Sequence, residues 1–411
     1  MLPLELIINV LEFLDECPLL YSADEWEYEV PNLSKWRCGS PSLASCSLVC
    51  RGWNDLCRPR IFRTIDLKRK TDQDMPFLPF EFLHFTAPHL CKYILELRIS
   101  YCGDSVPAWM DACLSRFINL RELELYGWAG TRREIAAPIT EGIASLLSSI
   151  NLERLVLSFW DEDEDDSDML LILSACSGTI EDLSMDTLPP KRSVDLSAIP
   201  LQALRRLELN VCSLPFDEMS TIVCPNLNAF AFNLHEDYAF ELPSWLPASI
   251  SELSIRASST TRLPQIKQPL HRLTLQLESY DSDTPWLSEY INHLPFLDEL
   301  RELIINIGVH SEETPLPLPD FVHYEALHHL LQPIKHSKLA IQITLHVWIP
   351  KHPEADELDG IRLQEIERME GTYSPLLQGG SFLGRLLIVW GDEDRVVTRC
   401  EVRSADWKAM P

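Results

Sequence analysis

Apolar and polar residues alternate in a short pattern that recurs nine times along the chain. Each copy reads apolar-x-x-apolar-x-apolar, and its central position is most often Leu. The central positions are 97, 123, 155, 183, 207, 230, 253, 273 and 303, so successive copies lie 20 to 32 residues apart. Side chains two residues apart face the same side of a strand, so Leu123 and Leu125 should point inward while Glu122 and Glu124 point outward. The pattern therefore predicts nine short strands, each with one buried face.

Helical periodicity occupies several of the intervals between these strands, at Pro107–Phe117, Thr140–Ile150 and Asp168–Gly178. A single strand–helix unit cannot bury its own apolar edge, so neighbouring units must stack. Spacing of this kind over residues 90–310 resembles leucine-rich repeats, although the regular Asn-containing signature is missing. The resemblance implies an α/β fold: an irregular solenoid with parallel strands on its concave face and helices on its convex face.

The first sixty residues contain two further helical patterns. Apolar residues recur at helical spacing over Leu2–Leu14, with Pro3 in the expected first turn. A second helical stretch begins at Ser42, a suitable N-cap residue, and Pro59 is expected to interrupt it. Residues 61–67 then form a strand-like segment. The order predicts a small helical module placed directly before the repeats.

These stretches resemble an F-box. LPLELIINVLEFLD is similar to its first helix and LASCSLVCRGWNDL to its second and third helices. The following RPRIFRTIDL resembles the segment that joins an F-box to its repeat domain in many fungal members. The resemblance implies a three-helix module that binds a Skp-type adaptor protein and, through it, a cullin. The adaptor-binding residues that it implies are Leu2, Pro3, Leu6, Val10, Leu11, Leu48, Val49 and Trp53.

The segment Glu16–Pro41 departs from the F-box pattern, because it is about twenty residues longer than the usual link between the first two helices. It is acidic and aromatic, and a surface loop can lengthen in this way at a small entropic cost. A second interpretation takes the helical segment as a cap that shields the end of the repeat array. The chain would then be a repeat-based protein-binding scaffold without ligase assembly.

Three regions follow from these patterns. Residues 1–67 form the F-box-like module, with its insertion at about 16–41, and residues 68–310 form the solenoid. Residues 311–411 are divergent terminal repeats or a C-terminal cap. In this last region LAIQITLHVWI and RLLIVWGDE are expected to be strands, and YEALHHLLQPI a helix.

The net charge restricts the kinds of molecule that the chain is expected to bind. Lys and Arg number 35 against 62 Asp and Glu, which gives a net charge of −27. This balance argues against binding to nucleic acid or to an anionic membrane, and favours steering of basic partners. The apolar start carries Glu5 and Glu12 and lacks the basic region of a secretory signal. We therefore expect a location in the cytoplasm and/or nucleus, with the cysteines as reduced thiols.

No pattern typical of an enzyme or a resident metal is found. Cys46, Cys50 and Cys57 lie close together but lack the paired spacing of a zinc site. The acidic run Trp160–Asp168 could bind calcium, but without the Gly and Glu of a calcium loop a solvated loop is favoured. His328, His329 and His336 have no matching carboxylate ligand. The sequence predicts no catalytic residues, no cofactor and no metal.

The surface expected to bind a protein substrate is the exposed strand face. Its candidate residues alternate with the buried positions and are Arg98, Glu122, Glu124, Arg154, Arg206, Arg256 and Arg272. With the F-box resemblance, they predict a substrate-recognition adaptor of an SCF-type (cullin-RING) E3 ubiquitin ligase. The sequence does not identify the substrate.

Overall fold

The computed structural model describes residues 41–67, 78–100, 109–126, 133–158, 167–186, 199–210, 223–234, 242–257, 263–277, 290–291, 293–294, 297, 299–310, 339–348, 383–391 and 396–403. The chain divides into two compact units, which are described separately. The first comprises Met1–Arg205 and Met219–Asn226, and the second comprises Arg206–Glu218 and Leu227–Pro411.

The first described elements of the first unit are a pair of packed helices, α2 (Pro41–Ser47) and α3 (Arg51–Ile61). The helical stretch predicted from Ser42 is confirmed, and it divides in two at residues 48–50. The expectation that Pro59 interrupts the second helix is wrong, since Pro59 lies inside α3. Pro59 has no backbone N–H to donate within the helix, and α3 ends two residues later at Ile61. The helix predicted over Leu2–Leu14 and the insertion at 16–41 fall outside the described residues, apart from Pro41.

Five parallel strands follow in the first unit. They are β1 (Thr64–Leu67), β2 (Glu96–Ser100), β3 (Glu122–Tyr126), β4 (Arg154–Ser158) and β5 (Asp182–Asp186). Their register aligns the central leucines of the repeated pattern, so Leu97 pairs with Leu123, Leu123 with Leu155, and Leu155 with Leu183. All four leucines are almost fully buried. The predicted inward positions of these strands are confirmed.

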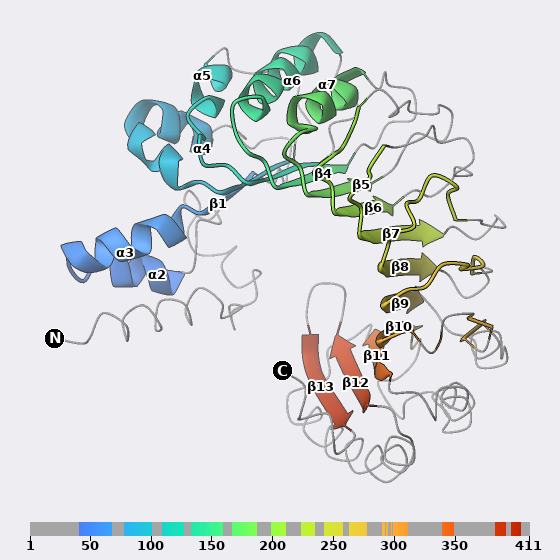
Figure 1. The fold of residues 1–411 in the computed structure, drawn as a ribbon. Helices are drawn as coiled ribbons and strands as arrows, with labels where there is room; N and C mark the ends of the chain where they lie inside the picture. The colour runs from blue at the N-terminus through green and yellow to red at the C-terminus, as the bar shows by residue number, and fades with distance from the viewer. Residues whose placement is uncertain are drawn as a thin grey trace. The chain divides into compact units, whose positions relative to one another are not determined.

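Helices connect the strands of the first unit. Between β1 and β2 lie α4 (Leu78–Glu81), the π-helix η1 (Phe82–Thr86) and the 3₁₀-helix η2 (Pro88–Tyr93). The later connections contain α5 (Met110–Leu114), α6 (Arg133–Leu147) and α7 (Ser167–Cys176), so the three predicted helices are confirmed, although α5 is shorter than predicted and α6 begins before the predicted start at Thr140. α5, α6 and α7 lie together over one face of the strands (Figure 1). That side of the sheet is the core of the unit, and the other side is called the outer strand face below.

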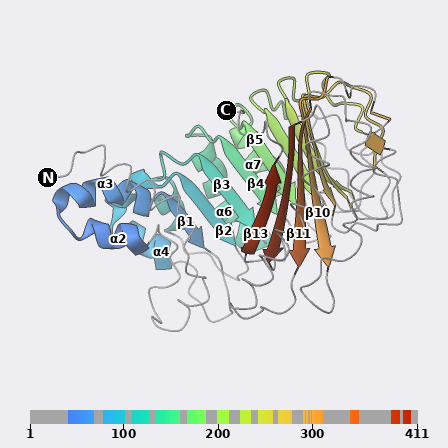
Figure 2. The same cartoon turned by 90° about the horizontal axis from the view of Figure 1, so that it is seen from below.

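The second unit continues the pattern with seven parallel strands. They are β6 (Arg206–Asn210), β7 (Ala229–Leu234), β8 (Glu252–Ala257), β9 (Arg272–Leu277), β10 (Glu302–His310), β11 (Ala340–Trp348) and β12 (Leu383–Gly391). The last strand, β13 (Val396–Arg403), reverses direction and pairs antiparallel with β12 (Figure 2). Phe230 and Phe232 stack inside β7 with ring centroids 5.3 Å apart, and Trp245 meets the edge of Phe230. The predicted α/β class with a parallel sheet is confirmed.

The connections of the second unit differ from expectation. Helices were expected between the strands, on the convex face of the solenoid. Between β6 and β9, however, the described connecting residues form turns and contain no helix. These intervals are the shortest in the chain, at 20 to 23 residues, and contain Pro225, Pro243, Pro247 and Pro264. Proline lacks a helical N–H and restricts the residue before it, so such short stretches favour turns.

The strands predicted after residue 310 are confirmed as β11 and β12, and β11 pairs in parallel with β10. The sheet therefore continues past that point, and β13 was not predicted. The helix expected at residues 324–334 lies outside the described part of the chain. Among the helices that the structure describes, none has both the length and the hydropathy that crossing a membrane requires.

Candidate functional site

Two exposed aliphatic side chains lie in the turn between α2 and α3. Leu48 is 84% exposed and Val49 is 67% exposed. Their backbone amides close the end of α2, because Leu48 N–H donates to Ser45 and Val49 N–H donates to Cys46. The turn is therefore ordered by the main chain, while both side chains project away from the helical core. Exposed neighbours of this type are candidates for contact with another protein.

The other apolar residues of this helical pair form its core. Leu43, Cys57 and Ile61 are buried, and Cys46, Trp53, Leu56 and Phe62 pack against them. Of the residues expected to bind an adaptor, Leu48 and Val49 are thus available on the surface, whereas Trp53 is half-buried against the core. Leu2, Pro3, Leu6, Val10 and Leu11 lie outside the described residues.

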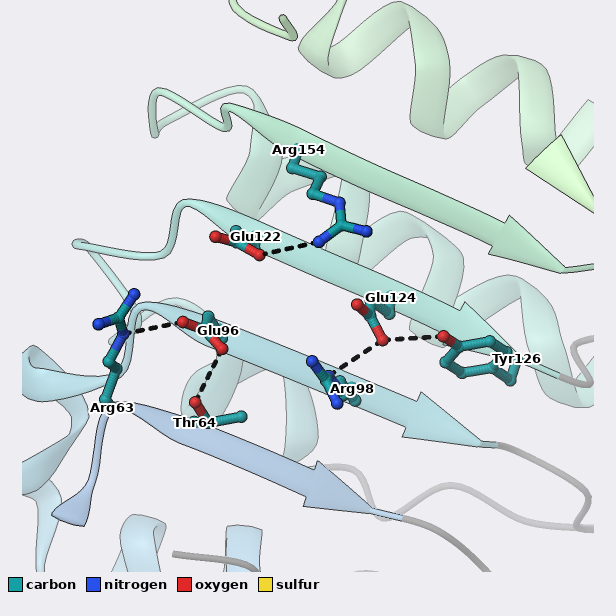
Figure 3. A network of polar contacts seen from close by, with 8 residues as sticks. All are labelled: Arg63, Thr64, Glu96, Arg98, Glu122, Glu124, Tyr126 and Arg154. Atoms are coloured by element: carbon teal, nitrogen blue, oxygen red, sulfur yellow. Dashed lines mark hydrogen bonds and ion pairs between the residues drawn. The ribbon is translucent and has the colours of Figure 1, made fainter. Parts of the chain in front are cut away.

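The outer strand face of the first unit carries a network of polar contacts between strands (Figure 3). Glu96, the first residue of β2, accepts two hydrogen bonds, one from Arg63 Nε and one from Thr64 Oγ1, both at 2.8 Å. On the next strands Arg154 Nη1 lies 3.5 Å from Glu122 Oε2. Thr64 joins β1 to β2, Arg63 joins the residue before β1 to β2, and Arg154 joins β4 to β3, so these contacts stabilise the lateral register of the strands.

Among the carboxylates of this face whose burial the structure describes, Glu124 is the most enclosed, with 7% of its surface exposed. Arg98 Nε lies 3.0 Å from its Oε2, and the hydroxyl of Tyr126 donates to the same oxygen at 2.8 Å (Figure 3). The neighbouring positions in the same row, Val156 and Ser184, are also buried. The middle of this face is therefore closed and charge-compensated.

Arginine–glutamate contacts recur on the second unit, on the side of its strands opposite to the buried central leucines, which is the outer strand face of that unit. Arg206 Nη2 lies 3.8 Å from Glu208, and Arg272 lies between Glu252 at 3.6 Å and Glu302 at 2.6 Å. The hydrogen bond to Glu302, together with both carboxylate charges, raises the pKa of Arg272. Arg256 is exposed on the same face. All seven residues expected to bind a substrate thus lie on outer strand faces, and most of them are already in ion pairs.

One row of the second unit contains Arg256, a substrate-binding candidate from the sequence, and three residues that were not among those candidates. Asn233, Arg256, Gln276 and Asn306 occupy aligned positions on β7 to β10, because Asn233 pairs with Arg256, Arg256 with Gln276, and Gln276 with Asn306. Each of these positions lies one residue past the last apolar position of its repeated pattern, so extending the alternation by one residue would have identified them. We call these four residues the amide row.

The cysteines of the helical pair do not form a metal site. Cys50 is exposed and Cys57 is buried, and burial raises the pKa of the Cys57 thiol. Burial also raises the pKa of Cys176 to about 12 and that of Cys224 to about 11. Within the described residues, no three His, Cys, Asp or Glu side chains gather in a way that could hold a metal ion.

Two other sequence features lie mostly or wholly outside the described residues. The acidic run Trp160–Asp168 is described only where α7 begins, and the three histidines at 328–336 lie outside the described residues.

The chain matches no family model, no curated protein and no solved structure. The proposal for its function below therefore depends on its own residues and their geometry.

Proposed function

We propose that this chain is the substrate-recognition subunit of an SCF-type cullin-RING E3 ubiquitin ligase. Its N-terminal helices would bind a Skp-type adaptor, and its strand array would bind a protein substrate. The observation that carries the proposal is the exposure of Leu48 and Val49 within the F-box-like sequence SLVCRGW, directly before the strand array. The proposed role requires a location in the cytoplasm and/or nucleus.

Burial energetics support a protein cover over this turn. Moving an exposed Leu or Val side chain fully out of water contributes about 1.5–3 kcal/mol. Leu48 and Val49 together could therefore supply several kcal/mol toward the ordering costs of association. The helical core beneath them, made by Leu43, Cys57 and Ile61, is already complete, so these two side chains are not needed to hold the helices together.

The order of the two parts supports substrate presentation. Helical pair and strand array follow one another directly, since α3 ends at Ile61 and β1 begins at Thr64. Such a short connection would hold a bound substrate near the ligase and raise the effective concentration of its lysines. Ubiquitin transfer itself would be carried out by other subunits, and this chain is not proposed to be an enzyme.

The test is co-purification with a Skp-type adaptor. The full chain should bind the adaptor, and the double variant Leu48→Asp with Val49→Asp should bind it at least about 100-fold more weakly, because two apolar contacts are lost. Both side chains are exposed, so the variant should unfold at the wild-type temperature. Ile118→Asp is the matched control, because Ile118 is 64% exposed in the first unit but lies outside the helical pair.

Two results would sink the proposal. The first is an unchanged adaptor affinity in the double variant, and the second is the absence of adaptor binding by the wild-type full chain. In the second case a protein-binding scaffold without ligase assembly would be the remaining interpretation.

A further inference from the structure

The amide row offers a repeated hydrogen-bonding group on the outer strand face of the second unit. Gln276 and Arg256 are exposed, and Asn233 and Asn306 are half-buried. Three of the four positions are carboxamides, which carry both donors and acceptors and no formal charge. A carboxamide can therefore both donate to and accept from the N–H and C=O groups of a polypeptide main chain.

A row of mostly small side chains runs beside the amide row. Ala231, Ser254, Thr274 and Ile304 are aligned across the same four strands and are half-buried. Three of these four side chains have at most two heavy atoms beyond Cβ. A main chain could therefore lie close to the sheet along this row and come within hydrogen-bond reach of the amides.

The charges around the amide row are already engaged within the chain. Arg272 contacts both Glu252 and Glu302, and Arg206 contacts Glu208. Arg256, the charged member of the row, also has an interaction partner within the chain. A strongly acidic or basic ligand would have to compete with these contacts, so the surface fits an uncharged ligand better. The net charge of −27 further disfavours nucleic acid.

We propose that the amide row binds an extended, uncharged segment of a partner protein through the main chain of that segment. Four neighbouring strands span three spacings of about 4.8 Å, or about 14 Å in all. An extended chain covers that span with about four residues at about 3.4 Å each. The inference depends on the proposed ligase role only for the identity of the bound segment as a ligase substrate.

The experiment uses a displayed library of random twelve-residue peptides, selected on the purified full chain. Peptides of low net charge should be enriched. The triple variant Asn233→Ala, Gln276→Ala and Asn306→Ala should bind them at least about tenfold more weakly, because up to three hydrogen bonds are lost. N-methylation of single backbone nitrogens in an enriched peptide should weaken binding at two or more positions, which a purely side-chain contact would not show.

Two controls keep the test decisive. Gln265→Ala removes an exposed carboxamide of the same unit outside the sheet and should leave the affinity unchanged. Gln276→Glu keeps the shape of the side chain but removes its donors, so it should weaken binding even if the triple variant is unstable. The Leu48→Asp and Val49→Asp variant should bind the peptides normally, which separates this inference from the adaptor proposal.

The inference is overturned if no peptide is enriched, if the enriched peptides share a charged consensus, or if the triple variant and Gln276→Glu both retain wild-type affinity. It is also overturned if N-methylation has no effect at any position.

Discussion

Glu124 illustrates how single side chains on the outer strand face are stabilised. A carboxylate that is only 7% exposed has lost most of its hydration, and such a loss must be offset by charge and hydrogen bonds. Arg98 and Tyr126 supply both, at 3.0 Å and 2.8 Å. Arg98 lies on β2, one strand away from Glu124, so a single residue couples two repeats of the array.

Removing Arg98 alone should therefore leave a buried carboxylate without its counter-charge. We expect Arg98→Leu to lower the free energy of unfolding by about 1–3 kcal/mol. Replacing both residues, as Arg98→Leu with Glu124→Leu, should recover much of that loss, since no charge is then left unpaired. Urea unfolding of the single variants and of the double variant, followed by circular dichroism, measures the coupling.

Arg121 provides the matched control for this cycle. It lies 3.1 Å from Glu153, but both side chains are more than half exposed. Arg121→Leu should change the free energy of unfolding by only about 0–1 kcal/mol, because water screens the pair. Equal losses for Arg98→Leu and Arg121→Leu would show that the burial of Glu124 does not govern its stability.

At the scale of elements, α5 and α6 approach one another closely at Gly142. A β-carbon at Gly142 would collide with the side chain of Asp111 on α5, and the glycine therefore permits the approach. Glycine inside a helix is less favourable than alanine by about 0.5–1 kcal/mol. At Gly142, the higher helix propensity of alanine favours a substitution, whereas the collision with the Asp111 side chain opposes it.

The Asp111 side chain should determine whether Gly142→Ala stabilises or destabilises the protein. Gly142→Ala alone should be neutral or destabilising, because the carboxylate must move. In an Asp111→Ala background the same change should stabilise the protein by up to about 1 kcal/mol, since the helix propensity of alanine is then expressed. Thermal unfolding of the wild type, the two single variants and the double variant measures this difference. If Gly142→Ala changes the unfolding temperature equally with and without Asp111, the collision with Asp111 does not determine its effect.

The strands were predictable as elements, while their connections were predictable only in part. All nine central positions of the repeated pattern lie in strands, because alternation is set by which side chains a strand buries. The described connections from β6 to β9 contain turns where helices were expected. Prolines at 225, 243, 247 and 264 could have indicated this outcome. β13 was missed because it is a hairpin partner of β12 and does not follow the repeat spacing.

At the scale of the whole molecule, a net charge of −27 opposes the array of local ion pairs. Exposed pairs such as Arg205–Glu181 contribute little individually, about 0–1 kcal/mol. Repulsion among the excess carboxylates acts over the whole chain and should dominate at low ionic strength. Salt should therefore stabilise this protein, even though it weakens each ion pair.

Raising the salt concentration from about 0.01 M to about 0.15 M shortens the Debye length from about 30 Å to about 8 Å. We expect this change to raise the unfolding temperature by about 2–4 °C, the shift that corresponds to about 1 kcal/mol in a domain of about 150–250 residues, which is the size range of each compact unit. Differential scanning calorimetry in NaCl and in KCl measures it, and the two salts should agree. A fall in the unfolding temperature would mean that the ion pairs outweigh the repulsion.

The α/β class, the positions of the described strands other than β13, and the inward faces of the repeat strands were determined by the sequence alone. These properties depend on the alternation of apolar and polar residues within about six positions, because a strand buries every second side chain. The pairing of Arg98 with Glu124 and the alignment of the amide row were decided only by the tertiary structure, because their members lie more than 19 residues apart and meet through the strand register. The division of the helical pair into a buried core and the exposed Leu48 and Val49 was likewise decided by packing, since every apolar residue of that stretch suits either role until its neighbours are in place.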